Sequence, residues 1–98
     1  MRRVLWIGQL DPGHIEEYTK KHREIWPEMV AMIKEAGIRN YSIFVDGVTV
    51  VGYYECDDFA KTQRHQEVAP ITSEWAKHMD GCFTLTPRIV NNEVMYIS

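Results

Sequence analysis

The sequence predicts a single α+β domain with the element order β-α-β-β-α-β, the ferredoxin-like arrangement. Three observations support this prediction. The chain opens with an alternating strand pattern, two β-rich runs are joined by Asp46-Gly47, and each half carries a helical pattern interrupted by a proline. The 98 residues have the composition of an ordinary globular protein, which is enough for one domain with one core.

The first element is expected to be a strand from Arg3 to Leu10. Alternation places one set of its side chains on a single face of the sheet, namely Val4, Trp6, Gly8 and Leu10. Asp11-Pro12 has the pattern of an N-cap followed by the first helical position. A helix should therefore begin directly after this strand.

The helix after Asp11 should carry an apolar stripe with a spacing of three to four residues. Its members are Ile15, Tyr18, His22, Ile25 or Trp26, Met29 and Ile33. Pro27 must break or kink the helix, because proline lacks the backbone donor and clashes with the preceding turn. Gly37 then ends the second segment as a C-cap.

The middle of the chain predicts a hairpin with strands from Asn40 to Val45 and from Val48 to Glu55. Asp46-Gly47 between two β-rich runs is a strong signal for a two-residue turn. On the first of these strands, alternation puts Tyr41 on the same face as Ile43 and Val45. Tyr41 should therefore project to one side of the sheet together with apolar residues.

The last third of the chain should repeat the pattern of a helix broken by a proline. Asp57 or Asp58 is expected to cap a helical stretch that Pro70 interrupts, and a short helix should resume near Thr72. That helix carries Trp75, His78 and Met79 on neighbouring turns. After a loop containing Gly81 and Pro87, the segment from Glu93 to Ile97 is predicted to be the final strand.

Helices on one face of such a sheet leave the other face uncovered. Its aromatic and apolar side chains have no further segment of the chain to cover them, so a second copy is the simplest partner. We therefore expect a homodimer of the dimeric α+β barrel type.

Charge and cysteine content exclude several other classes. The net charge is −3 with acidic and basic residues interspersed, which disfavours nucleic acid as a partner. The apolar run from Val4 to Ile7 is too short for a signal peptide or a membrane span, so we expect no membrane partner and a cytoplasmic location. Cys56 and Cys82 form no CxxC and are expected to be free thiols, with no histidine at a spacing that suggests a nucleophile.

Tyr18 and His22 are the most informative pair, because residues four apart lie on one helix face. A histidine on an apolar stripe is either a satisfied core residue or part of a site. Sugar rings bind by stacking on aromatic side chains while their hydroxyls find polar partners, which Tyr18, His22, Tyr41 and Trp75 could supply. Their convergence does not follow from the sequence, and each tryptophan, Trp6 included, is more commonly a core residue.

Metal and nucleotide sites have weaker support. His14 and His22 are two helical turns apart, too far to share an ion without other ligands, and His-Ile-Glu-Glu-Tyr lacks the second histidine of HExxH. The chain contains neither GxGxxG nor GxxxxGK[ST], so a nucleotide cofactor has no support. We expect no metal and no cofactor.

Several motifs of this chain together are typical of one protein family. They are Asp11-Pro, Glu16-Glu-Tyr18, Lys21-His22, Ile25-Trp-Pro-Glu28, Gly37, Asn40-Tyr-Ser-Ile43, Trp75, Lys77, Met79, Glu93-Val and Tyr96. In these residues the chain resembles the L-rhamnose mutarotase family. The resemblance implies a ferredoxin-like dimer without a cofactor, an isomerase that interconverts the α and β anomers of a 6-deoxy-L-sugar. It also implies that His22 is the catalytic proton donor and that Tyr18, Tyr41 and the Trp75-Ala76 region contact the sugar.

The chain departs from this family at three places. Trp75-Ala76 stands where the family usually has two tryptophans, the segment from Thr84 to Arg88 replaces a typical loop, and residues 61–70 diverge. Losing one indole removes apolar contact area and is expected to widen the sugar site. L-fucose or another aldose therefore stays open beside L-rhamnose.

Two alternatives come from other functional classes. A cofactor-independent oxygenase of the dimeric α+β barrel type would share the fold, because a fold does not specify a reaction. A non-catalytic sugar-binding or scaffold protein is supported only by the missing second tryptophan.

Overall fold

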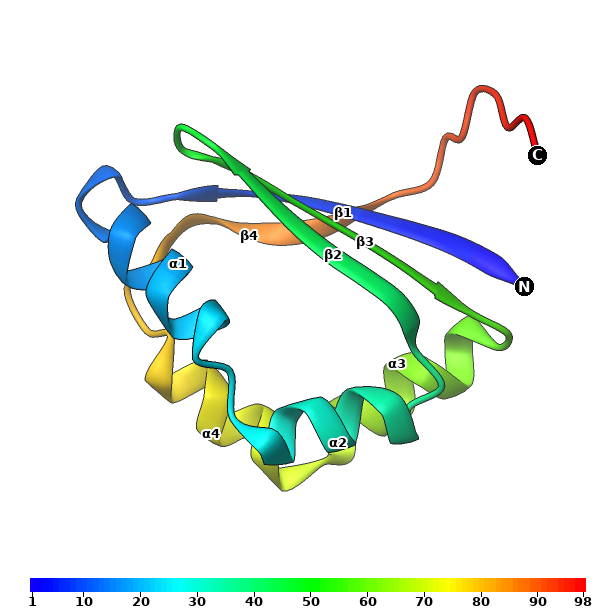
Figure 1. The fold of residues 1–98 in the computed structure, drawn as a ribbon, viewed down its shortest axis with the longest axis horizontal. Coiled ribbons are helices and arrows are strands. Elements are labelled where there is room, and N and C mark those ends of the chain that lie inside the picture. The colour runs from blue at the N-terminus through cyan, green and yellow to red at the C-terminus, as the bar shows by residue number, and fades with distance from the viewer.

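The fold is built on a four-stranded antiparallel sheet with the strand order β2-β3-β1-β4 (Figure 1). This computed structural model describes residues 1–98. The strands are β1 (Arg2–Leu10), β2 (Arg39–Asp46), β3 (Thr49–Cys56) and β4 (Phe83–Val90). The order confirms the ferredoxin-like prediction, with the N-terminal strand in the centre of the sheet.

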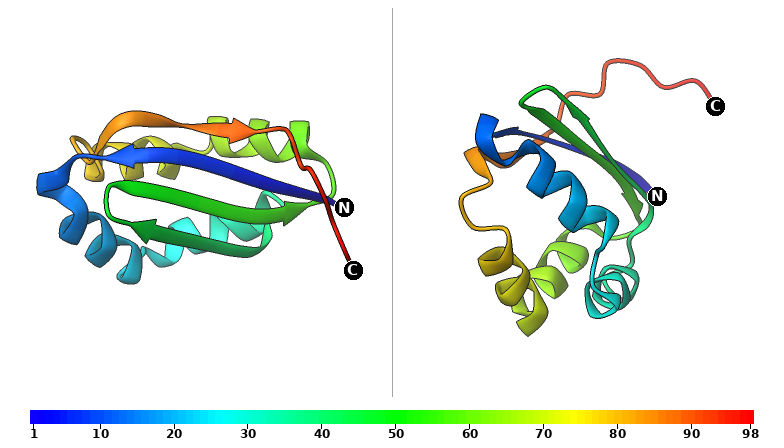
Figure 2. Two further views of the ribbon diagram at one scale, coloured as in Figure 1. Left: turned by 90° about the horizontal axis from the view of Figure 1, so that it is seen from above. Right: turned by 60° about the vertical axis from the view of Figure 1, so that its left-hand side comes forward.

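Four helices cover one face of the sheet, as Figures 1 and 2 show. They are α1 (Ile15–Arg23), α2 (Pro27–Glu35), α3 (Phe59–Val68) and α4 (Pro70–His78). Pro27 and Pro70 each occupy the first turn of a new helix, where a missing N–H costs no hydrogen bond. Pro27 thus breaks the first helical segment, as predicted. The last helix begins at Pro70 and not near Thr72. Pro70 interrupts the helical stretch after α3, as predicted, and is itself the first residue of α4.

The predicted caps are present. Asp11 caps a short 3₁₀ turn, η1 (Pro12–His14), by accepting a hydrogen bond from the Gly13 N–H, and α1 follows it directly. Asp58 caps α3 by accepting from the Lys61 N–H. Gly37 follows α2 with φ of +86°, a left-handed conformation that glycine adopts without strain.

The hairpin between β2 and β3 is shifted by one residue from the prediction. Asp46 pairs with Thr49, so the two turn residues are Gly47 and Val48, whereas Asp46-Gly47 was expected. Gly47 has φ of +60° at the first turn position, where one common hairpin turn requires glycine.

The prediction of a final strand from Glu93 to Ile97 is wrong. The last strand is β4, and residues 91–98 have no secondary structure. Pro87, which indicated a loop, lies inside β4. This strand is at the edge of the sheet and pairs only with β1. A proline is tolerated in an edge strand, because the side that lacks an N–H can face away from the sheet.

The core lies between the sheet and the helices. Its most deeply buried side chains include Val4, Leu10 and Tyr18, and Trp6 from the same face of β1 is also buried in it. The opposite face of the sheet carries no helix and exposes Leu5, Phe44 and Leu85. No helix in the structure is long and apolar enough to cross a membrane.

Candidate functional site

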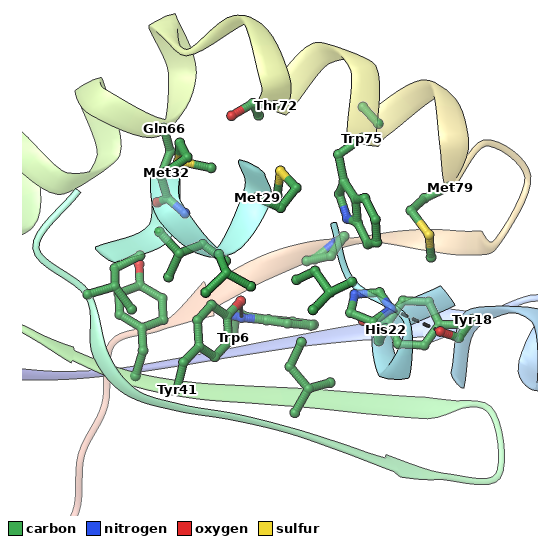
Figure 3. A pocket seen from close by; sticks show the side chains of 18 of the residues that line it. Trp6, Tyr18, His22, Met29, Met32, Tyr41, Gln66, Thr72, Trp75 and Met79 are labelled. Atoms are coloured by element: carbon green, nitrogen blue, oxygen red, sulfur yellow. Dashed lines mark hydrogen bonds between the residues drawn. The ribbon is translucent and has the colours of Figure 1, made fainter. Parts of the chain in front are cut away.

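A cavity of about 1350 Å³ lies between the sheet and the helical layer (Figure 3). Of the 30 residues that line it, 18 are hydrophobic, a balance suited to a ligand with both apolar and polar faces. The site residues predicted from the sequence all line this cavity: Tyr18, His22, Tyr41, Trp75 and Ala76. The fold therefore brings together side chains from α1, β2 and α4.

Tyr18 and His22 lie one above the other on α1, with ring centroids 4.1 Å apart. The Nδ1 of His22 is 2.9 Å from the backbone carbonyl oxygen of Tyr18. A carbonyl oxygen can only accept, so Nδ1 carries the hydrogen and donates it. In the neutral imidazole this leaves Nε2 without a hydrogen, as a proton acceptor.

Burial lowers the pKa of His22, because the charged form loses its hydration in the apolar cavity wall. The hydrogen bond to the Tyr18 carbonyl favours the charged form but has the smaller effect. His22 also lies in the last turn of α1, where the helix dipole favours the protonated form. Desolvation outweighs the hydrogen bond to Tyr18 in setting this pKa, so neutral imidazole is the resting form near pH 7.

Trp75 packs edge-on against His22, with centroids 5.4 Å apart and an interplanar angle of 88°. It makes a similar edge contact with Trp26, at 4.9 Å. Trp75 is half-buried, and its neighbour Ala76 is exposed at the cavity wall. The indole thus holds one side of the His22 ring, while position 76 offers only a methyl group.

Tyr41 lies in a bulge of β2. Arg39 pairs with Glu55 and Ser42 pairs with Tyr53, so Asn40 and Tyr41 together oppose the single residue Tyr54. Asn40 has φ of +53°, and its side chain donates to the Glu55 carboxylate at 2.7 Å. Bulges with a left-handed residue redirect the neighbouring side chain, and asparagine tolerates this conformation better than most residues.

The Trp6 indole N–H donates to the Tyr41 hydroxyl oxygen at 3.0 Å, from the adjacent side of the cavity. The sequence suggested that Trp6 was more commonly a core residue, and it is 9% exposed. It also lines the cavity, which sequence reasoning missed. Gly52, a strand glycine opposite Trp6, was the available signal, since glycine in a strand often marks a close approach.

The phenols of the cavity stay protonated near neutral pH. Burial raises the pKa of Tyr18 and of Tyr41, and raises the pKa of Tyr54 to about 12. The hydrogen bond from Trp6 opposes this effect at Tyr41 without cancelling it. These hydroxyls can exchange hydrogen bonds with a ligand, but they are poor bases.

The remaining histidines and cysteines do not join this site. His14 pairs with Asp11 at 2.7 Å beside the start of α1, and it does not line the cavity. No three histidine, cysteine, aspartate or glutamate side chains converge as metal ligands do. Cys56 and Cys82 are buried free thiols, as predicted.

Comparison with protein families gives a match over nearly the whole chain. A family model described as L-rhamnose mutarotase matches residues 3–96. An L-rhamnose mutarotase from Oceanobacillus iheyensis is 43% identical over 81 residues, which cover 81% of this chain and 77% of that protein. One from Burkholderia ambifaria is 60% identical over 49 residues, covering 50% of this chain and 47% of that protein.

Solved structures show the same fold. The crystal structure of an L-rhamnose mutarotase from Formosa agariphila superposes with a TM-score of 0.84 at 21% identity, covering 100% of both chains. An antibiotic biosynthesis monooxygenase superposes with a TM-score of 0.70 at 16% identity, covering 98% of this chain and 100% of that one. At these identities the two likenesses establish the fold alone.

Proposed function

The chain belongs to the L-rhamnose mutarotase family, and from that premise we propose how its cavity interconverts the α and β anomers of L-rhamnose. The enzyme is an isomerase that opens and recloses a hemiacetal ring. The observation that carries the assignment of the site is the imidazole of His22 in the cavity wall, whose Nδ1–H is held by the Tyr18 carbonyl.

His22 is proposed to move the proton in both halves of the reaction. Its Nε2 takes the proton from the anomeric O1–H, the C1–O5 bond breaks as C1=O1 forms, and the imidazolium gives its proton to O5. The aldehyde then rotates about C1–C2. Ring closure runs through the same steps in reverse and yields the other anomer, with His22 unchanged.

Two properties of the site support this role. O1 and O5 are both bonded to C1, so one nitrogen placed at the anomeric carbon can serve both oxygens in turn. A positioned acid–base group is worth about 10²–10⁴-fold in rate, and it works best with a pKa near the working pH. In this proposal His22 is the proton donor that the family resemblance implies, after it has first accepted a proton.

Tyr18, Tyr41 and Trp75 are proposed to bind the sugar. The Tyr18 hydroxyl makes no hydrogen bond to another residue, so its hydrogen-bonding capacity is free for a sugar hydroxyl. Trp75 supplies an aromatic surface beside His22, on which the apolar face of a pyranose can stack. Ala76 next to it sets the width of the site.

A homodimer is proposed to cover the open face of the sheet. Phe44 and Leu85 on this face are 66% and 61% exposed, and Val94 and Ile97 in the C-terminal segment are 88% and 78% exposed. Arg3 holds that segment near the sheet through an ion pair with Glu93. An exposed apolar surface of this kind is typical of an interface.

The oxygenase alternative rests on the fold alone, since the monooxygenase structure is 16% identical to this chain.

Which sugar the site prefers depends on the size of the side chain at position 76. Ala76 leaves room in the site that a larger side chain would fill.

Magnetisation exchange between anomeric protons tests the proposal directly. Purified protein should accelerate exchange between the two anomers of L-rhamnose, and L-fucose and common aldoses measured under the same conditions give its preference. Absence of catalysed exchange with every sugar would refute the proposed reaction, and oxygen uptake with aromatic substrates would then support the oxygenase alternative.

A further inference from the structure

The Trp6–Tyr41 hydrogen bond restricts what the Tyr41 hydroxyl can do. An indole N–H is only a donor, so the Tyr41 oxygen must accept from it, at 3.0 Å. A phenol has one hydrogen of its own, and the structure shows no residue that accepts it from Tyr41. The remaining polar function of this half-buried hydroxyl is therefore a donor that faces the cavity.

The direction of the Trp6 N–H is fixed by the backbone of β3. Trp6 pairs with Gly52, and a Cβ at position 52 would lie 2.0 Å from the indole Cε2 and 2.1 Å from Nε1. No side chain fits there without moving the ring, so the indole lies directly on the glycine. This contact aims Nε1 from β1 across β3 to Tyr41 on β2.

We propose that Trp6 is a positioning residue that commits the Tyr41 hydroxyl to donate a hydrogen bond to the sugar. The inference rests on the proposed function, in which Tyr41 contacts the substrate. Without the indole N–H, the hydroxyl could rotate and donate or accept in several directions. With it, the cavity presents one oriented donor before the sugar arrives.

The site of this donor is separate from the proton transfer. In Figure 3 the Trp6 indole lies between the Tyr41 hydroxyl and His22, so the two polar groups stand toward opposite ends of one aromatic ring system. A pyranose with its anomeric carbon at His22 would meet Tyr41 through a hydroxyl on its far side. Loss of the oriented donor should therefore weaken binding and leave the proton transfer intact.

A double-mutant cycle tests the proposal with wild-type protein, Trp6→Phe, Tyr41→Phe and the double variant. The measurement is KM and kcat for L-rhamnose anomer exchange. Each single variant should raise KM by roughly two- to tenfold, the effect of one hydrogen bond, and leave kcat within about twofold. The double variant should show no larger KM than Tyr41→Phe, because Trp6 acts only through that hydroxyl.

If the KM increases of the two single variants multiply in the double variant, the proposal is overturned, since Trp6 would then act through the shape of the cavity. An unchanged KM in Tyr41→Phe would overturn both this inference and the sugar contact assigned to Tyr41. Catalysed exchange between the anomers of L-rhamnose by the wild-type protein tests the proposed function separately. The inference can thus fail while that function stands.

The hydrogen bond can also be followed without replacing the buried indole. The Trp6 indole proton, assigned by through-space contacts, should move upfield in the NMR spectrum of Tyr41→Phe, because its acceptor is gone. Tyr53→Phe is the matched control, since the Tyr53 hydroxyl bonds Glu55 and does not line the cavity. An indole signal that is unchanged in Tyr41→Phe would overturn the proposal even if Trp6→Phe does not fold.

Discussion

The backbone carbonyl of Tyr18 accepts a hydrogen bond from the Nδ1–H of His22 over 2.9 Å, so the helix that carries the histidine also fixes its tautomer. Residues four apart share a helix face, which lets the ring reach back to this carbonyl. The same ring stacks on the Tyr18 phenol at 4.1 Å and meets the edge of Trp75. The position and the tautomer of His22 thus have one structural origin, its place on α1.

Replacement of His22 should abolish most catalysed exchange. His22→Ala is expected to lower kcat by about 10²–10⁴-fold, the contribution of a positioned acid–base group. The melting temperature should change little, because His22 is only half-buried. His65→Ala is the matched control, since His65 does not line the cavity and should leave exchange unchanged. Wild-type exchange rates in His22→Ala would show that His22 is structural.

The pH dependence of exchange should follow deprotonation of His22. Because burial lowers the pKa of His22 below its usual value of 6.5, activity should be lost only as the pH falls below that value and should be constant above it. The rate of catalysed exchange of L-rhamnose from pH 5 to 8, corrected for the uncatalysed rate, gives the profile. NMR titration of the His22 ring gives the pKa itself. A pKa above 6.5 would contradict the assignment of neutral imidazole as the resting form.

Gly52→Ala should displace the Trp6 indole. The added methyl group would overlap the ring, and overpacking of this kind costs about 1–3 kcal/mol of stability. KM for L-rhamnose should also rise, because Trp6 would no longer meet Tyr41. Gly13→Ala provides a control outside the cavity, since its Cβ would meet only the Asp11 carboxylate, which caps this turn, at 3.2 Å. Thermal unfolding and exchange kinetics report the two effects, and a fully stable Gly52→Ala variant would contradict the packing described.

Ala76→Trp should narrow the site and shift preference toward L-rhamnose. An indole at this position would add apolar contact and a second stacking surface beside Trp75. Discrimination by apolar contact is about 1–3 kcal/mol, so the ratio of exchange rates for L-rhamnose and L-fucose should change without becoming absolute. An unchanged ratio in a folded variant would show that position 76 does not meet the sugar.

Phe44→Glu should weaken the proposed dimer. The wild-type protein is expected to have about twice the chain mass of 11.5 kDa in light scattering, and the variant should shift toward the monomer. Val68→Glu is the matched control, because Val68 is 71% exposed on the helical layer, away from the open sheet face. A wild-type monomer at micromolar concentration would refute the dimer.

The sequence by itself determined most of the local structure, because each signal acts over a few residues. Asp11, Pro27 and Gly37 marked the start, break and end of the first two helices, and the spacing of Tyr18 and His22 placed them on one face. The local errors were the start of the last helix, the hairpin turn and the last strand. Pro87 was read as a loop residue, but it lies in a strand because β4 is at the edge of the sheet.

Only the tertiary structure decided which of these residues form one site. Tyr41 and Trp75 reach the Tyr18–His22 pair because the helical layer closes over one face of the sheet, and no spacing in the sequence encodes that closure. The role of Trp6 depends on Gly52 and Tyr41, residues on two other strands. The resting charge of His22 depends on desolvation by the assembled cavity, which outweighs the hydrogen bond to the Tyr18 carbonyl.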